Sequence, residues 1–274
     1  MPASLVIGDI EVRSLSDGLL RTSLDNLVGM SRLQAEERVG PTQDAALFIP
    51  VNCFVIRRDG NTIMIDAGAG TSMQPTLGAL PANLRAAGIK PASITHVVLT
   101  HIHPDHANGL VDEAGCPHFP GAEVIVSEKE LDFWLAPARG PEPDNVRRNR
   151  ARAAINLAPY RARLREVRDG EEVLGLTAIP APGHTPGHTC WRLGSGHPAL
   201  IAWGDLVHFS AIQIAHPDTA VTYDLDPVLA RQSRRHILDM IAADHLAIAG
   251  AHVEAPGLGY VVRRGRGYAF EPVA

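Results

Sequence analysis

The chain has 274 residues, of which 45% are apolar and 20% are charged, an ordinary composition for a globular protein with a sizeable core. Its formal net charge of −5 gives no electrostatic reason to expect nucleic acid or an anionic membrane as a partner. No apolar run approaches the roughly 20 residues that cross a bilayer, and the N-terminus lacks the basic start and long apolar stretch of a secretory signal. We therefore expect a cytoplasmic protein.

The first half of the chain predicts strands with intervening helices. Residues 10–15 alternate as a half-buried strand does, and Asp17-Gly18 predicts a turn after them. Residues 48–58 and 61–68 predict a hairpin. The other predicted elements of this half are, in chain order, a helix over 75–89, a buried strand over 94–100, a strand over 122–127 and a short helix over 128–135.

The second half repeats this order of elements without repeating the sequence. Its predicted elements are a loop over 137–150 that leads into a helix, a hairpin over 171–183 and 188–205, a helix over 226–245 and a last buried strand over 246–252. Asp226 is the predicted N-cap of the long helix, with Pro227 at its first position. Two sheets packed face to face with helices outside are the natural arrangement, an α/β fold.

The stretch "HIHPDH" directly after the strand over 94–100 is the strongest candidate for a functional site. His101 and His103 point the same way in an extended chain, whereas they would face apart in a helix. Pro104 argues against a helix through this stretch. Asp105 and His106 follow the bend and can face a second centre.

Three further residues share the same context at the ends of apolar strands: His184, Asp205 and His252. Strand ends let a rigid scaffold aim side chains at one point. Imidazole and carboxylate ligands suit zinc. Two ions roughly 3.5–4 Å apart could share Asp205 as a bridge and hold a hydroxide between them. A solvated histidine turn is a weaker alternative because of these three matching strand ends. A Ser–His–Asp relay is weaker still, since no G-x-S-x-G elbow is present in the sequence.

The motifs "IDAG" with Asp66, "HIHPDH", "GHTPGH", "GDLVH" and "GAH" follow one another over nearly the whole chain. In that order they resemble the metallo-β-lactamase superfamily. The resemblance implies one four-layer αββα sandwich domain over residues 1–274, in which residues 1–46 are an N-terminal strand and an irregular extension (the irregular part spanning 19–46) that could form a homodimer interface. It also implies that His101, His103 and His184 hold one metal, that Asp105, His106 and His252 hold the other, and that Asp205 bridges them.

Longer stretches such as "FPGAEVIVSEKELDFW" and "GDLVHFSAIQIAHPD" look like the methyl parathion hydrolase branch, near the quorum-quenching lactonases. This resemblance implies a binuclear metal-dependent hydrolase in which a metal-bridging hydroxide cleaves lactones, aryl esters or organophosphate triesters. Asp105 and Asp205 would anchor the metals and orient the nucleophile. We expect two divalent ions, with zinc first and iron, manganese or cobalt as other candidates. The alternatives are a diiron redox or oxygen- and sulfur-handling protein, a nucleic-acid-processing enzyme and a non-catalytic binding module.

The remaining predicted site residues surround the metal ligands. Asp66, His188 and His208 are expected to support the ligands without binding metal. Met73, Phe133 and Trp134 are the candidates for the substrate pocket, and Met73 stands where the parathion hydrolases carry an aromatic residue. The eight arginines between 147 and 168 are expected to form a solvated helix surface.

Overall fold

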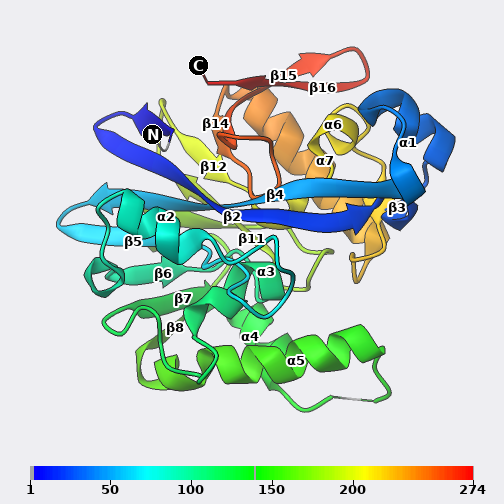
Figure 1. Ribbon diagram of the computed structural model, residues 1–274. Helices are drawn as coiled ribbons and strands as arrows, with labels where there is room; N and C mark the ends of the chain where they lie inside the picture. Colours follow the sequence, from blue (N-terminus) through cyan, green and yellow to red (C-terminus); the bar gives the residue numbers. More distant parts are fainter. Residues whose placement is uncertain (1–2, 139, 274) are drawn as a thin grey trace.

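Two β-sheets of seven strands each form the body of the protein in a computed structural model that describes residues 3–138 and 140–273 (Figure 1). The first sheet has the order β1 (Ser4–Ile7), β2 (Ile10–Ser23), β4 (Ala46–Arg58), β5 (Asn61–Ile65), β6 (His96–Val98), β7 (Glu123–Ser127) and β8 (Leu164–Val167). The second has the order β16 (Gly267–Pro272), β15 (Leu258–Arg264), β14 (Ala247–Ala249), β12 (Leu200–Ala202), β11 (Thr189–Leu193), β10 (Leu176–Pro180) and β9 (Glu172–Val173). A small sheet pairs β3 (Leu27–Val28) with β13 (Ala220–Val221).

Helices cover the outer faces of these sheets, and others lie in the connecting segments. In the described chain they are α1 (Arg32–Val39), α2 (Leu80–Ala86), α3 (Pro104–Ala107), α4 (Glu128–Leu135), α5 (Asp144–Leu157), α6 (Ser210–Gln213) and α7 (Pro227–Ala243). Short 3-10 helices occupy Leu24–Asn26, Gln43–Ala45, Pro91–Ser93, Asn108–Leu110, Ala158–Arg163 and Gly204–Leu206. None of the helices in the described residues combines the length and hydropathy needed to cross a bilayer.

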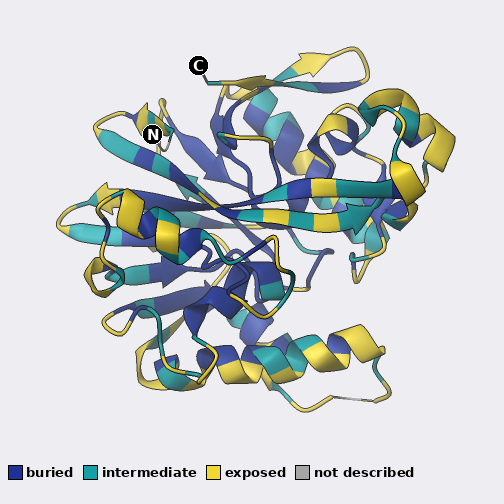
Figure 2. Ribbon diagram, in the orientation of Figure 1, coloured by how far each residue is buried: buried dark blue, intermediate teal, exposed yellow. Residues whose placement is uncertain are grey.

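Three apolar layers hold the sandwich together. Between the sheets, Phe54 and Ile65 of the first sheet share a cluster with Trp191 and Leu258 of the second. A second cluster joins the first sheet to α2, α4 and α5, and a third joins the second sheet to α7. Figure 2 accordingly shows inner strands such as β12 and β14 buried, whereas much of α1 and one side of α5 are exposed. The predicted four-layer αββα arrangement is therefore confirmed.

Several local predictions agree with the structure. The hairpin of β4 and β5, the buried strand β6 and the helix α4 lie where the sequence predicts them. Helix α7 begins as expected, because the Asp226 side chain accepts from the backbone N–H groups of Val228 and Leu229 and Pro227 follows it.

The turn predicted at Asp17-Gly18 is wrong. Strand β2 continues through these residues with a bulge in its pairing to β4. The Asp17 carboxylate accepts from the backbone N–H groups of Ala69, Gly78 and Leu80. Asp17 therefore anchors the loop after β5. This loop includes residues 75–79, which the sequence predicts as the start of a helix over 75–89, and α2 begins only at Leu80.

The two ends of the chain hold more regular structure than the sequence predicts. The stretch 19–46, expected to be irregular, contains the end of β2, the strand β3 and the helix α1. Helix α1 begins with a capping box between Ser31 and Gln34. After the strand predicted as the last one, a hairpin of β15 and β16 extends the second sheet.

Candidate metal centre

The candidate metal ligands follow the ends of four strands. Residues 101–106 follow β6, and helix α3 begins at Pro104 within this loop. His184 follows β10, Asp205 follows β12 and His252 follows β14. Strand β6 belongs to the first sheet and the other three strands to the second. The centre is therefore built where loops from both sheets meet.

One group of side chains consists of His101, His103, His184 and Asp205, whose potential ligand atoms all lie within 4.8 Å of one another. His103 Nδ1 is 2.8 Å from His184 Nε2. The Oδ2 atom of Asp205 is 3.1 Å from His184 Nε2 and 3.5 Å from His101 Nε2. Three imidazoles and one carboxylate oxygen thus converge on one point.

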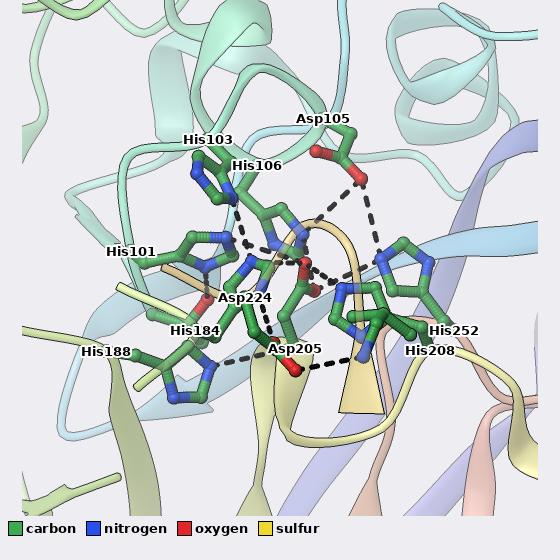
Figure 3. A network of polar contacts seen from close by, with 12 residues as sticks. His101, His103, Asp105, His106, His184, His188, Asp205, His208, Asp224 and His252 are labelled. Carbon is green, nitrogen blue, oxygen red and sulfur yellow. Dashed lines mark hydrogen bonds and ion pairs between the residues drawn. The ribbon is translucent and has the colours of Figure 1, made fainter. Parts of the chain in front are cut away.

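The second group consists of Asp105, His106, Asp205 and His252, again with potential ligand atoms within 4.8 Å. The other oxygen of Asp205, Oδ1, is 2.8 Å from His106 Nε2 and 3.1 Å from His252 Nε2. Asp105 Oδ2 lies 3.4 Å from His252 Nε2. Figure 3 shows Asp205 between the two groups, and the distances assign one of its oxygens to each.

These residues fit a pair of divalent ions. The Nε2 atoms of His101, His106 and His252 and the Oδ1 atom of Asp205 are buried without a hydrogen-bond partner among the described residues. Their ion-pair distances to one another are short, yet their directions are not those of hydrogen bonds. Buried polar atoms that face a common point without bonding one another are expected where a metal ion is the partner.

The other ring nitrogens of these histidines are held by the protein. His106 Nδ1 is 2.8 Å from the carboxylate of Asp66, and His184 Nδ1 is 3.1 Å from that of Asp224. His101 Nδ1 lies 3.1 Å from the Thr100 hydroxyl, and His252 Nδ1 lies 2.7 Å from the Pro50 carbonyl. A hydrogen bond at Nδ1 fixes the tautomer and leaves the lone pair of Nε2 for a metal.

Asp66 supports the same loop in two further ways. Its carboxylate accepts from the backbone N–H of Thr100 at 2.8 Å and from the Thr100 hydroxyl at 2.9 Å. Asp66 also adopts a left-handed backbone conformation with φ of 57°, which non-glycine residues rarely take. Such strain is tolerated where surrounding contacts determine the conformation, and here these contacts include His106.

The two other predicted supporting histidines lie in different environments. Both ring nitrogens of His188 bond to the backbone, Nδ1 with the Ala181 carbonyl at 3.1 Å and Nε2 with the Asp205 N–H at 3.0 Å. His188 therefore orients Asp205 and has no nitrogen left for a metal. His208 Nε2 lies 3.0 Å from Asp205 Oδ2, and its ring stacks on that of His252.

The model of the metallo-beta-lactamase superfamily matches residues 47–252, which hold every one of these ligand candidates. The chain belongs to the metallo-beta-lactamase superfamily. It is a metallo-hydrolase of that superfamily, and the family predicted from the motifs is confirmed.

Two bacterial proteins are similar to parts of the chain. The chain is 31% identical to the uncharacterized protein YobT of Bacillus subtilis strain 168, over 52% of this chain and 56% of YobT. It is 25% identical to the N-acyl homoserine lactonase AttM of Azorhizobium caulinodans, over 70% of this chain and 75% of AttM. The match to YobT thus spans little more than half of that protein.

Solved structures of the superfamily match over the whole chain. The hydrolase AbOPH superimposes with a TM-score of 0.94 at 30% identity, covering 100% of this chain and 97% of AbOPH. AidC, a dizinc quorum-quenching lactonase in complex with a product N-hexanoyl-L-homoserine, superimposes with a TM-score of 0.90 at 25% identity, covering 100% of this chain and 97% of AidC.

The centre combines histidines whose pKa is lowered with histidines whose pKa is raised. Burial, together with neighbouring imidazoles, lowers the pKa of His101 and His103 well below the usual range. Burial also lowers the pKa of His184 and His252, but nearby carboxylates, foremost Asp205, outweigh it and raise the pKa to about 9 and about 10. Because a metal and a proton compete for the same nitrogen, binding of divalent ions here is coupled to proton release.

A pocket of about 300 Å³ opens over the centre. It reaches His103, Asp105, His184, Asp205 and His208, and its other walls are Leu20, Arg21, Thr22, Met73, Gln74, Pro104, Trp134, Asn145, Val146, Asn149, Tyr223 and Leu225. Two of the three predicted pocket residues, Met73 and Trp134, thus line it. Phe133 is absent from this lining and lines two other hollows instead.

Three residues at this centre have no counterpart in the sequence prediction. Asp224 bonds His184, and Nη2 of the buried Arg234 of α7 lies 3.9 Å from Oδ2 of Asp224. The Arg234 guanidinium also donates to the carbonyls of Leu206, Pro217 and Thr219. Glu130 of α4 accepts from the backbone N–H of Ile102, in the loop of His101 and His103, and from that of Gly187, in the loop of His184. Glu130 and Asp224 each follow a strand by three residues, β7 and β13. The sequence predicts residues 128–135 only as a helix and predicts no strand before Asp224, and Arg234 lies within α7, so the part these residues play at the centre depends on tertiary packing.

Proposed function

We propose that this protein is a dinuclear metallo-hydrolase that opens lactones, with aryl esters and organophosphate triesters as poorer substrates. The observation that carries the proposal is the position of Asp205. Its two carboxylate oxygens face two separate sets of ligands, at 3.1 Å from His184 and at 2.8 Å from His106. A carboxylate shared in this way is the arrangement expected for a bridge between two ions.

The metal ligands in this proposal are the residues of the two groups. His101, His103 and His184 would hold one ion, Asp105, His106 and His252 the other, and Asp205 both. Imidazole nitrogen with carboxylate oxygen favours zinc, and iron, manganese and cobalt are accepted by the same ligand types. Two such ions supply Lewis acidity, which polarises the carbonyl or phosphoryl oxygen of a substrate and acidifies water.

The protein itself contributes the orientation of the ligands and a wall of the pocket. Asp105 and Asp205 fix the ligand geometry, and the Asp205 backbone is held by His188. Trp134 closes one wall of the pocket, with its ring 5.4 Å from that of His103. An ester group at the centre would thus have the Trp134 ring on one side and the ligand cluster on the other, which limits the approaches open to it.

Support for a lactone comes from the relatives. AttM is an N-acyl homoserine lactonase, and AidC is a dizinc lactonase holding a product N-hexanoyl-L-homoserine. Apart from the residues of the centre, the one charged residue of the pocket wall is Arg21, and the apolar residues Leu20, Met73, Val146 and Leu225 suit an uncharged substrate. The alternative of a diiron redox protein draws no support from these relatives, and we do not favour it.

The test is a hydrolysis panel of lactones, aryl esters, phosphotriesters and β-lactams on protein reconstituted with zinc. We expect lactones to give the highest kcat/KM. Asp205→Asn and His103→Ala should each lower it at least about a thousandfold, or about 4 kcal/mol in transition-state stabilisation, with the fold retained. The control is His236→Ala, since His236 is exposed on α7.

The outcomes separate the parts of the proposal. Near-normal turnover by Asp205→Asn would refute the dinuclear mechanism. Turnover of phosphotriesters above that of every lactone would refute the substrate preference and leave the hydrolase assignment standing.

A further inference from the structure

We infer that Glu130 is a positioning residue of the metal centre, whose carboxylate ties the loop of His101 and His103 to the loop of His184. This inference rests on the proposed function, because it concerns the geometry of the proposed metal ligands. Glu130 lies on α4, an element that contributes no candidate ligand. Its side chain has no exposed surface, with a relative exposure of 0%.

Both oxygens of the Glu130 carboxylate accept hydrogen bonds from segments that frame the centre. Oε2 accepts from the backbone N–H of Ile102 at 2.9 Å, and Ile102 lies between two ligand histidines. Oε1 accepts from the backbone N–H of Gly187 at 2.9 Å, three residues after His184. The indole N–H of Trp134 also donates to Oε2 at 2.9 Å.

Local structure explains why Glu130 reaches these groups. Helix α4 starts directly after β7, and its N-cap Ser127 accepts from the Lys129 N–H. Glu130 therefore lies in the first turn, and Trp134 follows it by four residues on the same face. A Cβ atom at Gly187 would lie only 2.4 Å from the backbone nitrogen of Glu130, so glycine is what lets the loop approach the helix this closely.

A buried carboxylate needs a reason, because removing it from water is costly unless hydrogen bonds replace the lost hydration. At Glu130 the three donors supply that replacement, and each comes from a different part of the centre. The loops carry His103 and His184, whose facing nitrogens are 2.8 Å apart. Trp134 is the pocket wall against His103. One side chain thus sets the spacing of two ligands and of the wall beside them.

The loops are also joined at their bases, independently of Glu130. The backbone N–H of Thr189 donates to the Thr100 carbonyl at 2.9 Å, and the indole of Trp191 donates to the Leu99 carbonyl at 3.0 Å. Loss of the Glu130 contacts should therefore leave the sandwich assembled and release only the parts of the loops nearest the ligands. A positioning role of Glu130 therefore predicts weaker metal binding in a protein that stays folded, whereas a purely structural role predicts a loss of stability.

Glu130→Gln tests the inference with little change in size. The amide has one oxygen, so its NH₂ group must face the N–H of either Ile102 or Gly187, and one loop loses its tie. We expect the ion held by His101, His103 and His184 to bind about 10–100-fold more weakly. The other ion should bind within about threefold of wild type. Competition with a chromophoric chelator measures both zinc affinities, and the cobalt(II) absorption spectrum reports the ligand geometry directly.

Two further variants control for charge and for folding. Glu128→Gln removes a carboxylate from the same helix. Among the described residues Glu128 pairs with Arg168 and bonds neither ligand loop, so the zinc affinity should not change. Gly187→Ala pushes the loop from α4 while keeping the carboxylate, and it should weaken the same ion selectively. It keeps the inference testable if Glu130→Gln does not fold.

Unchanged affinities and an unchanged cobalt(II) spectrum in Glu130→Gln would overturn the inference. Equal weakening of both ions with a lower melting temperature would also overturn it, because it indicates a general structural role. The wild-type arm reports on the proposed function separately. Wild-type protein that fails to bind two ions, or that hydrolyses no ester, would refute the proposed function itself.

Discussion

Replacing Asp224 by asparagine tests how firmly the protein holds His184 for a metal. The Asp224 carboxylate lies 3.1 Å from His184 Nδ1 with one oxygen and accepts from the Val221 N–H at 3.1 Å with the other. The backbone also ties the two segments, because the Leu225 N–H donates to the His184 carbonyl at 3.1 Å. Asparagine at this position keeps the shape but has a single acceptor oxygen.

Either orientation of the new amide creates a conflict. If its oxygen stays with Val221, its NH₂ group faces His184 Nδ1 and forces that nitrogen to accept. The ring proton then moves to Nε2, the nitrogen that faces Asp205, and blocks metal binding there. If its oxygen stays with His184, the NH₂ group faces the Val221 N–H, and a buried donor is left unsatisfied at a cost of about 1–3 kcal/mol.

The expected loss is about 10–100-fold in metal affinity, or about 1.4–2.7 kcal/mol. The upper part of this range is favoured, because both oxygens of Asp224 are used and the buried Arg234 behind it loses its negative neighbour. Chelator competition with zinc measures the loss, and Asp226→Asn is the control, since asparagine caps a helix as well as aspartate. Affinity within twofold of wild type in a folded Asp224→Asn protein would refute this reasoning.

Three further predictions concern stability. Removal of divalent ions with a chelator should lower the melting temperature by about 10–20 °C in calorimetry, since two sites at a hundred times their Kd add about 5 kcal/mol; an unchanged midpoint would argue against bound ions. Gly109→Ala should lower the free energy of unfolding in urea by about 3 kcal/mol, because the new Cβ atom would lie 1.9 Å from the Ala67 carbonyl oxygen. The control Gly121→Ala should change this free energy by less than about 0.5 kcal/mol, because the nearest atom to its Cβ would be 3.9 Å away. Asp226→Ala should cost about 1 kcal/mol in the same assay through loss of the α7 N-cap; no loss would contradict that capping role.

The sequence singles out the residues that the structure brings together in two groups, because each follows a strand that is recognisable by itself. Apolar runs that end in histidine or aspartate need no knowledge of the tertiary structure, and the extended geometry of His101 and His103 follows from Pro104. Their assignment to two ions, the homodimer and the cytoplasmic location stay predictions.

What the sequence does not predict depends on contacts between distant segments. Asp17-Gly18 has the composition of a turn, but it forms a bulge within β2, where Asp17 accepts from two N–H donors of the loop after β5 and one at the start of α2. Asp224 and Glu130 become supports of the centre only when α4 and the segment before α7 pack against the ligand loops. Likewise, only the packing of α4 decides that Trp134 lines the pocket and Phe133 does not.

The division of the ligands between the two sheets has a consequence for folding. The first sheet brings residues 101–106, and the second brings His184, Asp205 and His252. A chain with only one sheet formed offers an incomplete set for either ion, and it lacks the Asp205 bridge if the second sheet is missing. If the two ions bind as proposed, tight metal binding would require the two sheets to have docked, and a bound ion would slow their separation.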